Sequence, residues 1–256
     1  MKAKNPSGRT IEFDPVNHSF KVSQTDQILI GSTSVIKGFF NEFDADKWAP
    51  RTAKKRGITK AAILKEWAEK AERGRNEGTN VHEYAEYALS CKFWPDKIPP
   101  PMPKPLSDRC ATLFEITDRS IAWLSKYYQL EAIEKIIFSP RLGVAGIIDF
   151  LMINEDGLTI FDWKQNKIIK NSNPYQQALG PLKHLEDHDF NKYSLQLNIY
   201  RHILLEENYY PEDTKISMKL IHLTPEGYFP MRIYKMEEEV GEIFKQSNGL
   251  FPEFMG

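Results

Sequence analysis

The stretch "GIIDFLMINEDGLTIFDWK", residues 146–164, restricts the fold more than any other part of the chain. Two runs rich in β-branched and aromatic residues, which favour strands, flank Asn-Glu-Asp-Gly, a combination typical of a hairpin turn. If the loop has an even number of residues, Asp149 faces either Asp162 or Lys164 on the neighbouring strand. Because side chains alternate between the two faces of a strand, all three residues then share one face.

The shared face would bring two carboxylates close together, with about 5 Å between Cβ atoms for directly opposed residues. Like charges at that distance repel unless a cation lies between them, and Mg²⁺ is typically held by one or two carboxylates together with phosphate oxygens and water. Lys164 could then orient the attacking water or stabilise charge on the phosphate. A solvated surface hairpin is the alternative for this pattern taken alone. The other face carries four residues expected in the core: Ile148, Phe150, Phe161 and Trp163.

Size and charge narrow the class of protein. With 256 residues, 41% of them hydrophobic, we expect a single domain over 1–256, with a helical insertion or channel region at 40–130 and a catalytic core at 131–256. The net charge of -1 excludes a globally basic nucleic-acid binder, so any attraction to phosphate must come from a local patch.

The two cysteines, Cys91 and Cys110, are too few for a four-cysteine iron–sulfur cluster, so no such cluster is expected. Their scarcity predicts a reduced, intracellular protein. No run approaches 18 apolar residues, and the first ten residues lack the apolar stretch of a secretion signal. We therefore expect a cytoplasmic protein without a membrane partner.

The remaining secondary structure follows from periodicity and breakers. Gly74 and Gly78 suggest a break or bend within a long helical region, and the proline-rich "WPDKIPPPMPKPL" must be a connector or surface arm. The expected elements are short strands across 9–36, helices over 59–89 and 107–128, strands from about 129 to 163, a helix over 192–207, two strands over 215–234 and a helix over 237–246.

Two further groups could join the carboxylates. His82 and Glu86, four residues apart, share one face of a helix, so an imidazole nitrogen could add to a carboxylate-bound metal, with Glu86 beside it. A histidine satisfied at the helix surface is the alternative. Glu134 precedes a predicted strand and could enter the site, although Glu131 competes for that position.

Gln196 and Tyr200 share one face of an amphipathic helix. An amide and a phenol placed together could reach a backbone phosphate or the catalytic lysine. Tyr200 could equally be an aromatic residue at the edge of the core with a solvated hydroxyl.

Between Arg51 and Arg75 there are nine basic residues against three acidic ones, with Trp48 and Trp67 interleaved. Such a segment fits a surface that follows phosphates and stacks bases, and it also fits an ordinary solvated helix. The expected DNA contacts are Lys54, Lys55, Arg56, Arg73 and Arg75, together with Lys167 after the hairpin.

The motifs occur in an order that resembles a known superfamily. They are Gly78-x-x-x-His82, Glu134, Gly146-x-x-Asp149, Asp162-x-Lys164 and Gln196-x-x-x-Tyr200. Together they resemble the motifs of RecB-type nucleases in the PD-(D/E)XK superfamily, most closely stand-alone phage and mitochondrial genome-maintenance exonucleases. The match covers residues 78–200, and it suggests a bacterial or phage origin.

The resemblance implies an α/β fold, with a mixed central β-sheet flanked by helices in a restriction-endonuclease-like core, and a helical N-terminal region. It implies Mg²⁺ or Mn²⁺ bound by His82, Asp149, Asp162 and the backbone carbonyl of Trp163. Lys164 would help activate water. The catalytic set would be completed by Glu134, Gln196 and Tyr200.

The expected function is metal-dependent hydrolysis of DNA by an exonuclease that acts on single strands or ends. An endonuclease with the same site and a non-catalytic nucleic-acid-binding module are the alternatives. Relatives commonly carry threonine after the catalytic lysine, whereas this chain has Gln165, which leaves the substrate contacts near Lys167 open.

Overall fold

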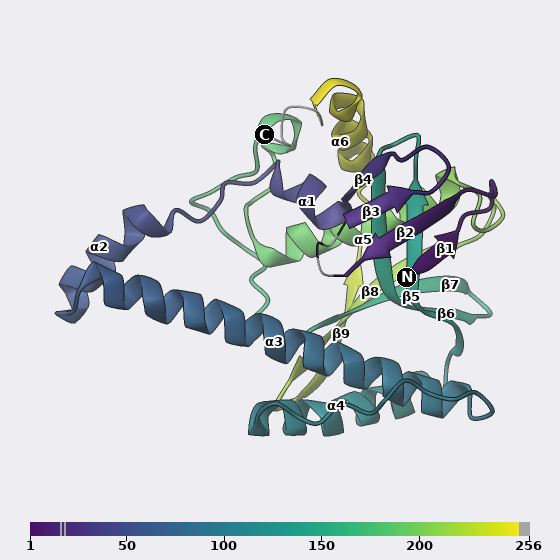
Figure 1. Cartoon of the computed structure of the whole chain (residues 1–256), viewed down its shortest axis with the longest axis horizontal. Helices are drawn as coiled ribbons and strands as arrows, with labels where there is room; N and C mark the ends of the chain where they lie inside the picture. The colour runs from purple at the N-terminus through teal and green to yellow at the C-terminus, as the bar shows by residue number, and fades with distance from the viewer. Residues whose placement is uncertain (16, 18, 251–256) are drawn as a thin grey trace.

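A computed structural model describes residues 1–15, 17 and 19–250 of the chain. Within these residues six α-helices flank a nine-stranded mixed open sheet (Figure 1), which confirms the predicted α/β class. The strands are β1 (Lys2–Lys4), β2 (Thr10–Asp14), β3 (Ser19–Val22), β4 (Ile28–Gly31), β5 (Gln129–Ser139), β6 (Val144–Asn154), β7 (Gly157–Lys164), β8 (Ile216–Thr224) and β9 (Gly227–Ile233). The helices are α1 (Ser32–Lys37), α2 (Ala45–Arg56), α3 (Lys60–Phe93), α4 (Asp108–Leu124), α5 (Asp189–Glu206) and α6 (Glu237–Leu250).

The sheet runs in the order β1-β2-β3-β4-β6-β7-β8-β9, with β5 paired to β6 away from this path. The pairs β4–β6 and β7–β8 are parallel and the others are antiparallel. One core lies between the sheet and helices α1, α5 and α6, and a second lies between the sheet and helices α3 and α4. Across the described residues, none of the helices combines the length and apolar character needed to cross a bilayer.

The β6–β7 hairpin has the predicted even loop. Asn154 pairs with Gly157 across a two-residue turn, and Phe150 pairs with Phe161. The same register places Asp149 opposite Asp162. Beyond Phe150 and Phe161 a side chain replaces the backbone as the hydrogen-bond acceptor. Asp149 Oδ2 accepts a hydrogen bond from the Trp163 N–H at 2.8 Å.

The predicted core face of the hairpin needs one correction. Phe150, Phe161 and Trp163 are buried together against α3 and α4, as expected, but Ile148 packs in the core beneath α5. The alternation of faces therefore changes at Asp149. In the neighbouring strand the residue opposite Asp149 is Glu134, whose backbone has a positive φ of 46°.

Two helical predictions also need correction. The predicted break at Gly74 and Gly78 is absent, since α3 runs without interruption through 34 residues. Alanine, glutamate, lysine and arginine dominate its first half, and these are strong helix formers that carry the chain across two glycines. Residues 32–37, predicted as part of the strand region, form the short helix α1, which begins directly after β4.

The proline-rich connector contains no helix, as predicted, and it links α3 to α4. Asn80 on α3 fixes its end through two hydrogen bonds. The Asn80 amide donates to the Lys104 carbonyl at 3.0 Å and accepts from the Leu106 N–H at 3.1 Å. The Asn80 side chain thus satisfies backbone groups of an extended segment that pairs with no strand.

Candidate metal and phosphate site

Three half-buried side chains from three elements converge where the hairpin strands part. They are His82 on α3, Glu134 on β5 and Asp149 on β6, and each offers a ligand atom within 4.8 Å of those of the other two. His82 Nδ1 lies 3.4 Å from Asp149 Oδ2. One imidazole nitrogen and two carboxylates at this spacing form a donor set that suits a divalent cation.

Packing explains why these side chains meet. The second half of α3 is anchored by Val81 and Ala85, which are buried against the sheet, so His82 is held at the edge of that contact. Ile133 pairs with Phe150 and Lys135 pairs with Ile148, which leaves Glu134 opposite Asp149.

Glu134 is half-buried and lies among other carboxylates. Burial, reinforced by the nearby charges of Asp149, Glu86 and Asp162, raises the pKa of Glu134 from 4.5 to about 8. The pKa of Glu86 is also raised, mainly by burial. Carboxylates with raised pKa values in one place are what a cation would relieve.

Asp162 and Lys164 form an ion pair beside this group, and only 3% and 15% of their side chains are exposed. Burial raises the pKa of Asp162, while Lys164 opposes that shift. The pKa of Lys164 lies above its ordinary value, because attraction to Asp162 and Asp149 outweighs the cost of burying the ammonium. Lys164 Nζ also lies 4.7 Å from the centre of the Tyr193 ring, so it is held as a cation.

The structure groups the expected metal ligands differently from the sequence. Among the described residues, the possible metal group contains Glu134 in addition to His82 and Asp149, whereas Asp162 is paired with Lys164. The Trp163 N–H contacts Asp149. Of the two glutamates that competed for the site, Glu134 is the one that enters it, because Glu131 is exposed and accepts a hydrogen bond from the Tyr210 hydroxyl.

The two residues expected on α5 do lie together. Gln196 Nε2 donates to the Tyr200 hydroxyl at 2.8 Å, and Tyr200 is buried. Burial raises the pKa of Tyr200 to about 12. Gly146 is required by this packing, since a Cβ at that position would lie 2.3 Å from Tyr200 Cε1. The sequence singled out Tyr200, but the α5 tyrosine that faces Lys164 is Tyr193.

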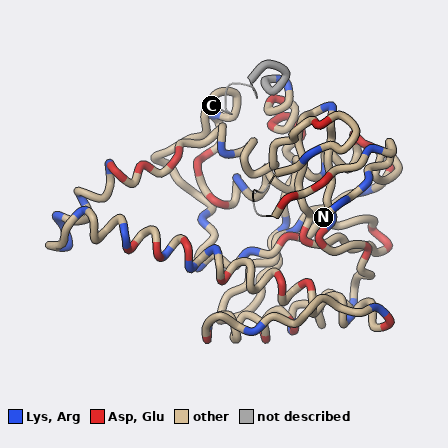
Figure 2. The backbone as a smooth tube through the Cα atoms, in the orientation of Figure 1, with Lys and Arg blue, Asp and Glu red and all other residues tan. Residues whose placement is uncertain are grey.

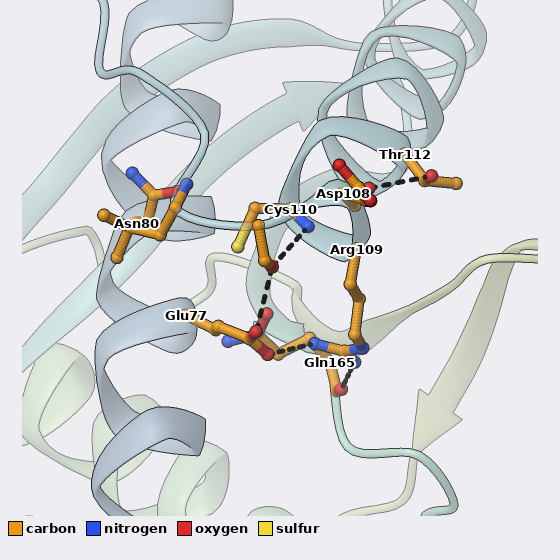
Figure 3. A network of polar contacts seen from close by, with 9 residues as sticks. Glu77, Asn80, Asp108, Arg109, Cys110, Thr112 and Gln165 are labelled. Atoms are coloured by element: carbon orange, nitrogen blue, oxygen red, sulfur yellow. Dashed lines mark hydrogen bonds and ion pairs between the residues drawn. The ribbon is translucent and has the colours of Figure 1, made fainter.

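A polar network that the sequence did not reveal fixes the chain directly after Lys164 (Figure 3). Arg109 at the start of α4 donates to the backbone carbonyl of Gln165 and pairs with Glu77 at 3.3 Å. Ser107 Oγ donates to the other oxygen of Glu77 at 2.9 Å. A Cβ on Gly78 would lie 2.8 Å from Gln165 Nε2, so the glycine lets α3 approach this loop closely.

The basic residues expected to contact DNA are exposed. Lys54, Lys55 and Arg56 occupy the last turn of α2, and Arg73 and Arg75 lie on the first half of α3. Arg56 is paired with Glu66 through contacts of 3.0 and 2.9 Å. Figure 2 shows basic and acidic segments interleaved along these helices, and Lys167 lies in the loop after β7.

Two comparisons were made for this chain, one against protein-family models and one against curated proteins, and neither found a match. The function must therefore be argued from the geometry of the site.

Proposed function

We propose that this chain is a Mg²⁺- or Mn²⁺-dependent DNA exonuclease that hydrolyses phosphodiester bonds in single strands or at DNA ends. One observation carries the proposal: His82, Glu134 and Asp149 lie within 4.8 Å of one another, beside the buried Asp162–Lys164 pair. The order of these residues along the chain is the order that resembles the PD-(D/E)XK nucleases.

The donor set fits a hard divalent cation. The two carboxylates suit Mn²⁺ and Mg²⁺, the imidazole supplies a third donor, and the raised pKa of Glu134 reflects its burial beside other carboxylates. When bound, such an ion polarises a phosphodiester and lowers the pKa of water.

The residues of the chain supply the rest of the chemistry. Lys164 is held as a cation by Asp162 and by the ring of Tyr193, so its ammonium can donate to a phosphate oxygen on which charge develops. The Trp163 N–H fixes one oxygen of Asp149, which orients that carboxylate. Arg109 secures the backbone just beyond Lys164 and keeps the lysine in place.

The test is incubation of purified protein with end-labelled linear single strands, linear duplex and closed circular DNA, in Mg²⁺, Mn²⁺ or EDTA. We expect metal-dependent cleavage of the linear substrates, with the closed circles intact. Lys164→Ala and Asp149→Asn should each lower turnover by about 10²- to 10³-fold, which is the usual loss for a group that stabilises transition-state charge.

Two matched controls separate the site from its surroundings. Asp156 lies in the exposed turn of the same hairpin, and Lys170 lies in the exposed loop beyond it. The variants Asp156→Asn and Lys170→Ala should therefore both retain wild-type turnover. Cutting of closed circles would assign the site to an endonuclease. Binding of DNA without turnover in any metal would overturn the enzymatic proposal in favour of a non-catalytic module.

A further inference from the structure

A hollow of about 460 Å³ lies between α1, the segment that follows it and α5, and Tyr193 in its lining faces Lys164. Its volume falls in the range of about 300–1,000 Å³ that is typical of small-ligand sites. Its lining includes Lys37, Phe40, Phe43, Lys192, Tyr193 and Gln196. Figure 1 shows α1 and α5 side by side, with the chain then leading away to α2.

The lining combines aromatic rings with positive charge. Phe40 is buried in the wall, and Lys192 Nζ lies 4.8 Å from its ring centre. Phe43 is 67% exposed, and its ring meets the Trp67 ring edge-on. Lys192 is already paired with Asp187 at 2.6 Å. Lys37 is exposed, and it is the cation best placed to meet an incoming anion.

The hollow adjoins Lys164 through one residue that belongs to its lining. Tyr193 lines it and also lies 4.7 Å from Lys164 Nζ, measured to the ring centre. Gln196 lines it too and donates to Tyr200. The Tyr193 hydroxyl donates to Asn166 at 3.0 Å, which fixes the ring shared by the two sites.

We propose that this hollow binds one nucleotide of a DNA single strand, adjacent to the phosphodiester held at the metal group. The base packs against Phe43 and the wall formed by Phe40 and Tyr193, and Lys37 contacts the phosphate. Aromatic stacking beside a cation suits bases of any sequence, whereas a purely apolar ligand would leave the charge of Lys37 without a partner in the ligand. One carboxylate, Glu42, also lines the hollow, so the charge of its lining is mixed. The contact with the phosphate therefore comes from Lys37. This inference rests on the proposed nuclease function.

The test measures binding without turnover. A fluorescein-labelled 12-nucleotide oligothymidylate is titrated with the full chain in EDTA, and anisotropy is read. Phe43→Ala combined with Lys37→Glu should weaken binding about tenfold or more, because one stacked base and one phosphate contact are lost. Both side chains are exposed, so thermal melting should show an unchanged fold. Lys37→Ala alone should lower the slope of log affinity against log salt by about 0.7.

A matched control lies in the second hollow, of about 1020 Å³, at the turn end of the hairpin. Tyr127→Ala combined with Lys126→Glu removes an exposed ring and reverses an exposed lysine there, and it should bind within twofold of wild type. Oligothymidylate that carries 4-thiothymidine should crosslink to a peptide containing Phe40, Phe43 or Tyr193.

The outcomes separate this inference from the proposed function. If the Phe43 and Lys37 double variant binds like wild type, or crosslinks fall elsewhere, the nucleotide site is refuted even if the enzyme cleaves DNA. If the double variant and the crosslinks behave as expected but wild type cleaves nothing in any metal, the nucleotide site stands and the nuclease proposal falls.

Discussion

The two halves of α3 are one helix in two different environments. From residue 60 to 79 only Ile63 is buried, and it packs in a small apolar cluster with Ala49 and Ala53 of α2. From Asn80 onward the same helix buries seven residues against α4 and the sheet. Figure 1 shows the first half extending with α2 away from the sheet.

The contrast shows that burial changes the acid–base properties of charged side chains on this helix. On the exposed half, Glu69 meets Lys65 at 3.9 Å, a surface pair worth at most about 0.5 kcal/mol. On the buried half, Glu86 has a raised pKa and contributes to the still larger shift of Glu134. Identical side chains therefore become part of a site only where the helix meets the sheet.

The largest effect is expected from the buried half. His82→Ala removes the only nitrogen donor of the metal group within the described residues, and should weaken Mn²⁺ affinity at least about 100-fold, beyond the usual cost of losing a residue that only supports a ligand. Isothermal titration calorimetry measures this change. His184→Ala is the matched control, since His184 also lies beside a carboxylate, Glu239 at 3.0 Å, but on the surface. Equal Mn²⁺ affinity in the two variants would contradict the site.

A second prediction concerns pH in metal-free buffer. The pKa of Glu134 is 4.5 in the unfolded chain and about 8 in the folded one, so the folded state binds more protons between these values. This group therefore costs stability progressively as the pH rises from 4.5 to 8. Glu134→Gln removes that cost and should raise the free energy of unfolding by up to about 4 kcal/mol at pH 8, with little gain at pH 4.5.

Urea denaturation at several pH values, with EDTA present, provides the measurement. Glu131→Gln, on the same strand but exposed, should change stability by less than about 0.5 kcal/mol at every pH. A gain for Glu134→Gln that does not depend on pH would show that its carboxyl titrates normally.

The smallest effect distinguishes the two glycines of α3. A Cβ at Gly74 meets nothing within 4 Å, so Gly74→Ala should stabilise the helix by about 0.5–1 kcal/mol. A Cβ at Gly78 meets Gln165 Nε2 at 2.8 Å, so Gly78→Ala should gain less, because the amide must move. Thermal or urea unfolding compares them directly. Equal gains would mean that α3 does not contact the loop after β7.

The hairpin was predictable because strand geometry determines it locally. A two-residue turn between apolar runs fixed the register, and the register set Asp149 opposite Asp162. Helical spacing likewise placed Gln196 beside Tyr200. In each case the interacting residues belong to one hairpin or one helix, where period and register suffice.

The remaining contacts depend on how distant elements pack. Nothing near Arg109 in the sequence indicates that it meets the carbonyl of Gln165, 56 residues away. Ile148 was misplaced because strict alternation fails at Asp149, opposite the irregular backbone of Glu134 in β5. The role of Tyr193 required the position of α5 relative to β7. Such contacts are set by tertiary packing, which local patterns do not encode.

At Glu134 the backbone conformation that favours glycine conflicts with the carboxylate that the candidate metal group needs. The Glu134 φ of 46° costs a side chain about 1 kcal/mol or more and would suit glycine without penalty. Glycine at position 134 would therefore give a more relaxed strand, but the molecule would lose one of the two carboxylates of the candidate metal group.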